Sequence, residues 1–314
     1  MSNTSRFFAY SNYIVATSRL MRQYHVTDQV FADNLQSMSG FGRIKHRKIN
    51  STIRIEELLR NSWFTEVLLR EARKYPDFLP FSNPWAMVQA YYSIYLTIRA
   101  YFLATNRVVA TTHRTTLNTI CSDLVGCKNR FPEPWRSIIN GDTKIKLLLL
   151  SNSQYSNNLI LKNALESPYT GDPWQHYFLF LKTTRDRQIY NGILDWKKQS
   201  KRARILAQER GRLIQKLEPT SFFDALYRIR ARSNYHDVDS FAFGSSNSQA
   251  ADELHKSLGT IIHCTLFMFE AMIAKSIGKR NFDQIVSSFI ASGPGSKGGL
   301  TIGSRWAIIK ISCL

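Results

Sequence analysis

The sequence predicts a mainly α-helical protein, and three features of the chain support this fold class. Apolar residues recur at helical spacing in residues 51–75 and 250–279, which places them on one face of a helix. Residues 85–105 are apolar on almost every side, as expected of a helix at the centre of a core. Strand patterns are scarce. With 314 residues and 44% hydrophobic composition, the chain can bury a full core in one large or two modest domains.

The N-terminal part is expected to form an arm followed by one helix. Residues 1–50 are polar and uneven and end in a cluster of arginine, lysine and histidine, so we expect a basic N-terminal arm. This arm is either solvated or in contact with RNA. A helix is predicted from Ser51, with Leu58 and Trp63 on its apolar face. It ends before Pro76, because proline disfavours helix in the residue that precedes it.

The helix predicted over residues 85–105 begins at a clear start signal. Asn83 is expected to cap this helix and Pro84 to occupy its first position. Arg99 is its one charged residue. Because an unpaired charge is costly inside a core, Arg99 needs either a structural partner (an acid or a backbone carbonyl) or a phosphate.

The middle of the chain combines loop-like segments with the densest basic run. A short helix is expected over residues 116–124, a loop over 129–142, either strand or helix over 144–150, and an exposed excursion over 151–172. Residues 195–216 predict a helix in which eight cations face two acids. Such a surface suits a polyanion, and a merely solvated charged face is the alternative. The residues expected to contact RNA phosphates are Lys197, Lys198, Lys201, Arg202, Arg204, Arg210 and Arg212.

The C-terminal part is expected to hold two helices and a tail. Pro219 and Ser221 precede a helix predicted over residues 222–234. The helix over 250–279 carries a long apolar face and belongs to the core. Residues 279–314 are expected to form a glycine-rich tail, in which a flexible linker leads to a short apolar end.

The charge of the chain favours an anionic partner. The 42 lysines and arginines exceed the 23 acids, which makes the formal net charge +19. A charge of this size attracts polyanions over long distances, and release of condensed counterions adds affinity. Nucleic acid is the first candidate partner, an anionic membrane surface the second, and an acidic protein the third.

No metal, cofactor or membrane span is expected from the sequence. The four cysteines form no CxxC pair, and the seven histidines are scattered without an HExxH motif. The two most apolar windows carry charged residues, so they resemble buried helices more than membrane spans. The N-terminus makes a poor secretory signal, and the few cysteines suit a reducing compartment. A cytoplasmic protein is therefore expected.

Residues 227–237 combine the two chemical groups that cleavage of a phosphodiester needs. Arg228, Arg230 and Arg232 alternate with other residues, and His236 follows Arg230 by six positions. Arginine holds a phosphate in a fixed fork of donors, and histidine exchanges a proton near neutral pH. The alternative is an exposed basic helix end with a histidine whose hydrogen bonds are satisfied.

Two segments of the chain resemble the HEPN family. The first is residues 90–100, with the sequence AYYSIYLTIRA, which is similar to a helix of that family. The second is Arg230 to His236, which fits the family's R-x(4–6)-H signature with five intervening residues. The resemblance covers about 84–125 and 220–278. It implies a HEPN-like helical bundle over residues 51–278, with a basic insertion at about 126–219 and an N-terminal extension.

The resemblance implies a metal-independent endoribonuclease in a defence or toxin–antitoxin setting. The RNA 2′-OH would attack the adjacent phosphate and leave a 2′,3′-cyclic phosphate. Arg230 and His236 would be catalytic, with His236 moving a proton and Arg230 stabilising charge on the phosphate oxygens. The supporting residues would be Arg232, Asn234, Tyr235 and Asp237, of which Asp237 could orient the imidazole.

The implied partners are RNA, a second copy in a homodimer or higher homo-oligomer, and an inhibitory or activating protein. Two other interpretations stay open. One is a non-catalytic RNA-binding or regulatory helical module built on the same bundle. The other is a different helical protein that handles nucleic acid or phosphate, with an accidental likeness to the family. A sheet-containing core would argue against the HEPN resemblance.

Overall fold

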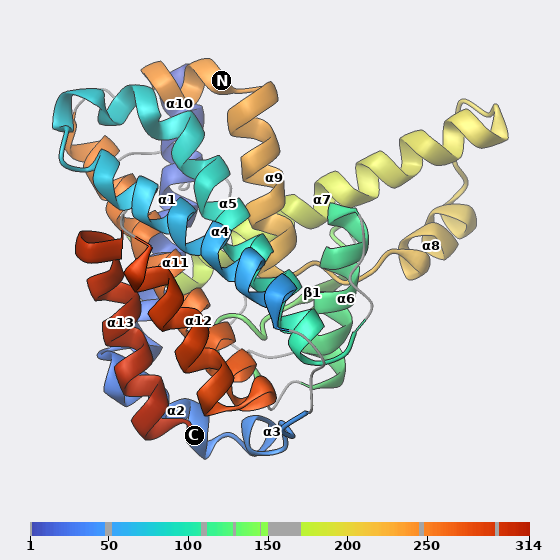
Figure 1. Ribbon diagram of the computed structural model, residues 1–314. Coiled ribbons are helices and arrows are strands. Elements are labelled where there is room, and N and C mark those ends of the chain that lie inside the picture. Colours follow the sequence, from blue (N-terminus) through green and yellow to red (C-terminus); the bar gives the residue numbers. More distant parts are fainter. Residues whose placement is uncertain are drawn as a thin grey trace.

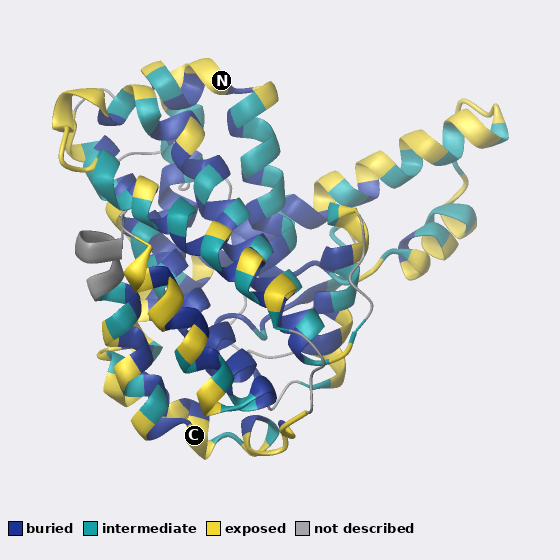
Figure 2. Cartoon of the chain, in the orientation of Figure 1, coloured by how far each residue is buried: buried dark blue, intermediate teal, exposed yellow. Residues whose placement is uncertain are grey.

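Helices α5 and α11, both expected from the sequence, pack against each other at the centre of the fold (Figure 1). Helices α4, α9 and α10 pack on α5, and α1 packs on α11. The side chains of α5 and α11 are buried along most of their length (Figure 2). The mainly α-helical fold class is confirmed, because helices make up nearly all the regular structure in the described residues.

The computed structural model describes residues 2–47, 52–107, 112–127, 130–144, 146–149, 171–244, 248–292 and 295–314. In chain order the elements are α1 (Asn3–Tyr24), α2 (Asp28–Ser37), α3 (Ser39–Gly42), α4 (Ile53–Ala72), the 3-10 helix η1 (Pro76–Phe78), α5 (Leu79–Ala104), α6 (His113–Gly126), β1 (Ile139–Asp142), β2 (Lys146–Leu149), α7 (Pro173–Ser200), α8 (Ala207–Lys216), α9 (Phe222–Tyr235), α10 (Val238–Phe243), α11 (Ser248–Ile277), α12 (Lys279–Ala291) and α13 (Gly295–Ser312). The excursion expected over 151–172 lies outside the described residues, apart from its last two.

Strands β1 and β2 form a short antiparallel hairpin, with Ile139 opposite Leu149. β2 lies within the segment for which strand and helix were both open. The backbone of Ile139 also exchanges hydrogen bonds of 2.9 and 2.7 Å with Thr220. The hairpin therefore holds the residues that lead into α9.

Helix α5 begins earlier than the sequence predicted. Its first residue is Leu79, and Pro84 lies inside the helix near its N-terminal end. Asn83 is not the cap: its side chain is buried, and neither its Oδ1 nor its Nδ2 has a hydrogen-bond partner in the described part of the chain. Pro80, the second residue of α5, fits the helix start because the first four backbone N–H groups of a helix have no helical acceptor, whereas Pro84 removes one backbone donor of the second turn.

Helix α1 belongs to the core, whereas the sequence suggested an arm. Phe7, Ile14 and Leu20 are fully buried, and α1 packs against α7, α10 and α11. Ser2 caps the helix by accepting a hydrogen bond from the N–H of Ser5. The basic cluster that follows α3 is in contact with solvent, as expected, since the described residues 45–47 are all exposed. Polar residues interrupt the apolar periodicity of α1, so the sequence pattern did not predict this helix.

Residues 279–314, expected as a tail, form α12 and α13, which pack together. A buried ion network joins them to the core. The guanidinium of Arg305 donates to both carboxylate oxygens of Glu66 at 2.7 and 2.9 Å and to both of Glu270 at 2.9 and 2.8 Å. Trp63 also donates its indole N–H to Glu270 at 2.8 Å. All four side chains are buried, so α4, α11 and α13 are held by one set of charges.

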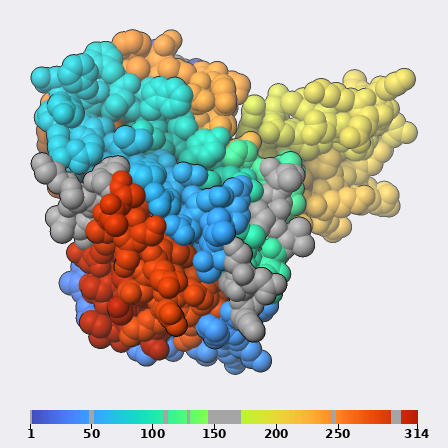
Figure 3. All heavy atoms as spheres, in the orientation of Figure 1, coloured from blue at the N-terminus to red at the C-terminus, as the bar shows by residue number. Residues whose placement is uncertain are grey.

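The C-terminal part of α7 and helix α8 form an arm that projects from the body of the molecule, whereas the N-terminal half of α7 is buried against α1 and α9 (Figures 1 and 3). The single helix expected over 195–216 is instead two helices, because Lys201 ends α7 in the left-handed conformation. Gly192 lets α8 approach closely, since a Cβ at this position would lie 3.1 Å from Leu213 Cδ2. We call residues 193–216, which comprise the end of α7, the connecting segment and α8, the basic arm.

Helix α9 carries the arginine and histidine residues, and its start matches the prediction. The side chain of Ser221 accepts from the N–H of Asp224, and Asp224 accepts in return from the N–H of Ser221 at 2.8 Å. This reciprocal cap fixes the first turn. Phe223 and Ile229 are buried on the side of α9 that faces the core. The opposite side is free to line a surface hollow.

Candidate functional site

A cleft of about 250 Å³ lies between α6, α7 and α9. Four arginines and one histidine line this cleft together with two acids, so it attracts anions. We call it the α9 cleft; its charged and titratable residues are Arg114, Arg187, Glu218, Asp224, Arg228, Arg232 and His236.

A second hollow, of about 480 Å³, adjoins the α9 cleft because Arg187, Arg228 and Arg232 line both. It lies between α1, α7 and α9. On a helix, residues four apart share one face. This is why Arg228, Arg232 and His236 meet in the same cleft. The arginines therefore stand in a row that reaches from one hollow to the next.

Three arginines of the α9 cleft make no ion pair with any described residue: Arg114, Arg187 and Arg228. The guanidinium of Arg187 lies 5.1 Å from the ring centre of Tyr190, and that of Arg228 lies 5.8 Å from the ring centre of Phe180. The Nε of Arg228 is buried and has no hydrogen-bond partner in the described structure. Burial lowers the pKa of Arg228. These cations are available to an anionic ligand.

His236 stands at the end of α9 and is exposed. Its backbone N–H donates to the carbonyl of Arg232 at 3.1 Å, so the residue closes the helix while its side chain lines the α9 cleft. A histidine in this position can exchange protons with solvent and with a ligand in the cleft. Asn234 beside it is half-buried, and Tyr235 is 64% exposed.

The carboxylate of Asp237 forms hydrogen bonds with residues other than His236. Its buried carboxylate accepts from Arg6 Nη1 at 3.0 Å, from the Tyr10 hydroxyl at 3.1 Å and from Arg232 Nη1 at 3.4 Å. Asp237 therefore ties α1 to the end of α9 and holds Arg232. The expected role of orienting His236 has no contact to support it among the described residues.

Arg230 points away from the α9 cleft. Successive helical residues are about 100° apart, so Arg230 lies on the side of α9 opposite to Arg228 and Arg232. Its Nη2 donates to the hydroxyl of Tyr92 on α5 at 2.8 Å. Its guanidinium also lies 5.2 and 5.4 Å from the ring centres of Tyr92 and Tyr235. The structure thus places Arg230 and His236 in different surroundings.

The side of α9 that carries Arg230 faces an aromatic cluster around His113. The Nδ1 of His113 lies 2.8 Å from the Tyr91 hydroxyl, and its ring stacks on Tyr227 with 5.6 Å between the ring centres. Burial lowers the pKa of His113, and Arg230 and Arg99 lower it further. The imidazole is therefore neutral near pH 7. Arg99 finds no acid among the described residues: its guanidinium lies 5.7 Å from the ring centre of Tyr95.

The cations expected to contact RNA lie on the basic arm. Arg210 is engaged in a bidentate ion pair with Asp142, at 3.0 and 2.7 Å, and Arg202 pairs with Glu209 at 3.1 Å. The other five make no ion pair with a described residue: Lys197, Lys198, Lys201, Arg204 and Arg212. All five except the half-buried Lys197 are exposed.

Sequence reasoning missed the cleft residues that come from other helices. Arg114 and Arg187 belong to α6 and α7, and only folding brings them to α9. Asp224 was also missed. Burial raises the pKa of its carboxyl to about 6, although the hydrogen bonds from Ser221 lower it. The Ser221-x-x-Asp224 capping box marks Asp224 as a helix start, but no local pattern shows that Arg114, Arg187 and Asp224 meet in one cleft, because they come from three helices.

The chain matches no protein-family model, no curated protein and no solved structure. Within the described residues, α11 is the one helix long and apolar enough to cross a membrane, and 83% of its most apolar window is buried inside the protein. We interpret α11 as a core helix.

Proposed function

We propose that the protein is an endoribonuclease that binds RNA in the α9 cleft and cleaves it without a metal ion, with His236 moving the proton. The observation that carries the proposal is that three arginines, none in an ion pair with a described residue, surround a hollow edged by an exposed histidine. The resemblance of residues 90–100 and 230–236 to the HEPN family supplies the reaction type. The RNA 2′-oxygen forms a bond to the neighbouring phosphorus as the bond from that phosphorus to the 5′-oxygen of the next nucleotide breaks. His236 moves the proton from the 2′-OH to the departing 5′-oxygen, so the products are a 2′,3′-cyclic phosphate and a 5′-hydroxyl.

Arg232 takes the phosphate-binding role in this proposal, in place of Arg230. Arg232 shares a cleft with His236, and Asp237 holds its guanidinium from behind. Charge builds up on the phosphate oxygens during attack, and fixed arginines beside them lower the barrier. Arg187 and Arg228 extend the row of cations to neighbouring phosphates. Arg230 acts by positioning α9 against α5 through Tyr92.

The alternative function is RNA binding without cleavage. The separation of Arg230 from His236 favours it, because the two residues of the R-x(4–6)-H signature face different parts of the chain. A single imidazole with arginines binds RNA phosphates whether or not it transfers a proton. Under either function, the resemblance to the HEPN family implies a homodimer and a protein regulator.

The test is incubation of the purified protein with single-stranded RNA in EDTA, with the fragment ends resolved. His236→Ala is compared with His46→Ala, which removes an equally exposed histidine that lines none of the three hollows described. DNA of the same sequence serves as a substrate control because it lacks the 2′-OH. We expect cyclic-phosphate ends on RNA with the wild type and His46→Ala, none with His236→Ala, and intact DNA throughout.

Two results would redirect the proposal. Intact RNA with all proteins, together with RNA binding that His236→Ala leaves unchanged, would favour the binding module. Equal cleavage by wild type and His236→Ala would place the chemistry outside the α9 cleft.

A further inference from the structure

A third hollow, of about 690 Å³, shares no lining residue with the other two. It lies where the end of α1 and the start of α2 meet α4 and α11. Its titratable lining groups comprise three histidines, one aspartate, one cysteine and four cations, which are His25, Asp28, His255, His263, Cys264, Arg22, Arg70, Arg73 and Lys256. Neither the expected RNA-binding residues nor the α9 cleft involves this region.

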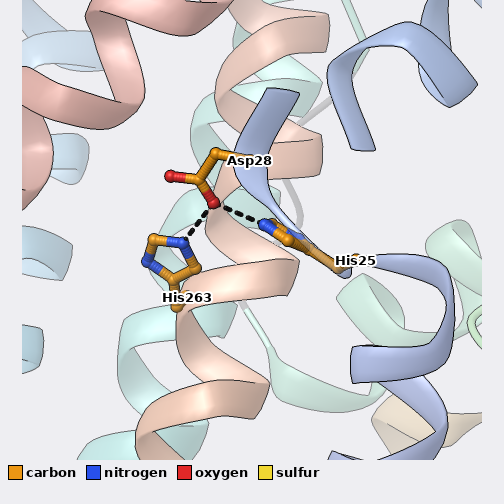
Figure 4. Close-up of side chains that lie close together, drawn as sticks. All are labelled: His25, Asp28 and His263. Carbon is orange, nitrogen blue, oxygen red and sulfur yellow. Dashed lines mark hydrogen bonds and ion pairs between the residues drawn. The ribbon is translucent and has the colours of Figure 1, made fainter. Parts of the chain in front are cut away.

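Three of these side chains converge on one point (Figure 4). The Nε2 of His25 lies 2.5 Å from Asp28 Oδ1, and the Nε2 of His263 lies 2.7 Å from the same oxygen. One atom from each residue lies within 4.8 Å of the other two. Both distances are shorter than the usual 2.9–3.0 Å of an N–H···O hydrogen bond. Two imidazole nitrogens and one carboxylate oxygen therefore face a common centre.

We propose that His25, Asp28 and His263 bind a zinc ion. Two imidazole nitrogens with one carboxylate oxygen form a set that Zn²⁺ accepts at about 2.0–2.2 Å from each ligand atom. In a tetrahedral site this brings ligand atoms to about 3.3 Å from one another. Small rotations of the two rings would open the present 2.5 and 2.7 Å separations to that value. The fourth position faces the hollow, where water or an anionic oxygen can complete the coordination.

The ligands are held by rigid elements. His25 closes α1 through its N–H, which donates to Met21 at 2.8 Å, and Asp28 is the first residue of α2, directly after the cap Thr27. His263 projects from the middle of α11. Ligands fixed on helices need little ordering when the ion binds. Cys264 lines the hollow but is not among the residues whose ligand atoms converge.

Two arginines near His263 oppose the metal. Its Nδ1 lies 3.4 Å from Arg70 Nη2 and 3.5 Å from Arg305 Nη1. Arginine only donates, so these contacts favour a ring with its proton on Nε2. Zinc at Nε2 requires that proton to move to Nδ1, towards both cations. Removing the partly exposed Arg70 should therefore tighten zinc binding, which no purely structural role of the cluster would predict.

The test measures Zn²⁺ binding to the full chain, stripped of metal and free of any histidine tag, by calorimetry and by competition with a zinc chelator. We expect one zinc per chain. Asp28→Asn and His263→Ala should each weaken binding at least about 100-fold, since outer-shell partners alone contribute about 10–100-fold. His236→Ala, which removes an exposed histidine outside this hollow, should leave it unchanged. Arg70→Ala should bind more tightly than wild type.

Co²⁺ in place of zinc adds a spectroscopic readout. Its visible absorption should show bound nitrogen and oxygen ligands in the wild type and should vanish in Asp28→Asn. If His263→Ala does not fold, Asp28→Asn and Arg70→Ala still decide, with circular dichroism as the check on folding. Absence of stoichiometric zinc in the wild type, or equal affinity in Asp28→Asn, would overturn the site. RNA cleavage in EDTA is a separate result and does not bear on it.

Discussion

At the scale of single residues, α9 turns its arginines in two directions. Arg228 and Arg232 line the α9 cleft with His236, whereas Arg230 binds Tyr92 on α5. The sequence shows the alternation of arginines, and helical geometry alone tells which of them share a face. It does not show which face points to the core, because that depends on what packs against α9. The prediction that Arg230 is catalytic came from the R-x(4–6)-H signature, which carries no information on that packing.

The two arginines should therefore respond differently to substitution. Arg232→Ala should lower the rate of RNA cleavage by about 10²–10³, the usual loss for a group that stabilises transition-state charge. Arg230→Ala should lower the unfolding temperature and leave the cleavage rate of the folded protein within a few fold. Cleavage kinetics beside thermal unfolding separate the two effects. The opposite order would restore Arg230 to the catalytic role.

Asp224 should make stability depend on pH. Burial raises its pKa to about 6 in the folded protein, above the usual 3.8. The folded state then holds the proton more tightly than the unfolded state does. This contribution to stability is complete below about pH 4 and is lost as pH rises through 6.

The measurement is urea unfolding of wild type and Asp224→Asn at several pH values between 4 and 8. Titrations shared by both proteins cancel in the difference between their unfolding free energies. Asp224→Asn should gain stability relative to wild type as pH rises from 4 to 7. A difference that does not change with pH would show that Asp224 titrates normally.

At the scale of elements, strong periodicity was the reliable signal. The sequence located α5, α9 and α11 to within a few residues, because each carries a continuous apolar face or a clear cap. It failed for α1 and for residues 279–314, where polar residues and glycines mask helices that packing stabilises. The basic run over 195–216 predicts one helix rather than two, since nothing local reveals that Lys201 turns the chain back.

The basic arm should act in RNA binding by charge alone. Replacing Lys198 and Arg204 by glutamine should weaken RNA binding while leaving the fold intact. The slope of log affinity against log salt should become shallower by about 0.7 for each phosphate of single-stranded RNA that the arm no longer neutralises. The matched control replaces the exposed Lys45 and Arg47 by glutamine. An equal effect of both sets would mean that net charge, and not the arm, decides affinity.

At the scale of the whole molecule, the buried ion network holds distant parts of the chain together. Arg305 compensates the carboxylates of Glu66 and Glu270, and all three are buried. Removing one partner of such a network leaves buried charge without compensation, which typically costs about 3–5 kcal/mol. The same network without any charge can be nearly as stable.

Arg305→Met should therefore lower the free energy of unfolding by about 3–5 kcal/mol. Adding Glu66→Gln and Glu270→Gln to that variant should recover much of this stability. Arg54→Ala is the control, because it breaks an exposed pair with Glu57, and such pairs contribute at most about 1 kcal/mol. Urea unfolding of the four proteins gives all the values. A triple variant less stable than Arg305→Met would mean that the contacts of Arg70 with Glu66 and of Trp63 with Glu270 contribute more when the carboxylates are charged.

The same network sets an order on events during synthesis. Arg305 follows Glu66 by 239 residues and Glu270 by 35. Until the ribosome has added that arginine, the growing chain carries two carboxylates that the core can bury only at a high cost. Domains often begin to fold from the N-terminus while translation continues. Here α4 and α5 can pair early with Arg70 beside Glu66, whereas Glu270 finds its cation only when α13 arrives, so we expect the junction of α4, α11 and α13 to close late in synthesis.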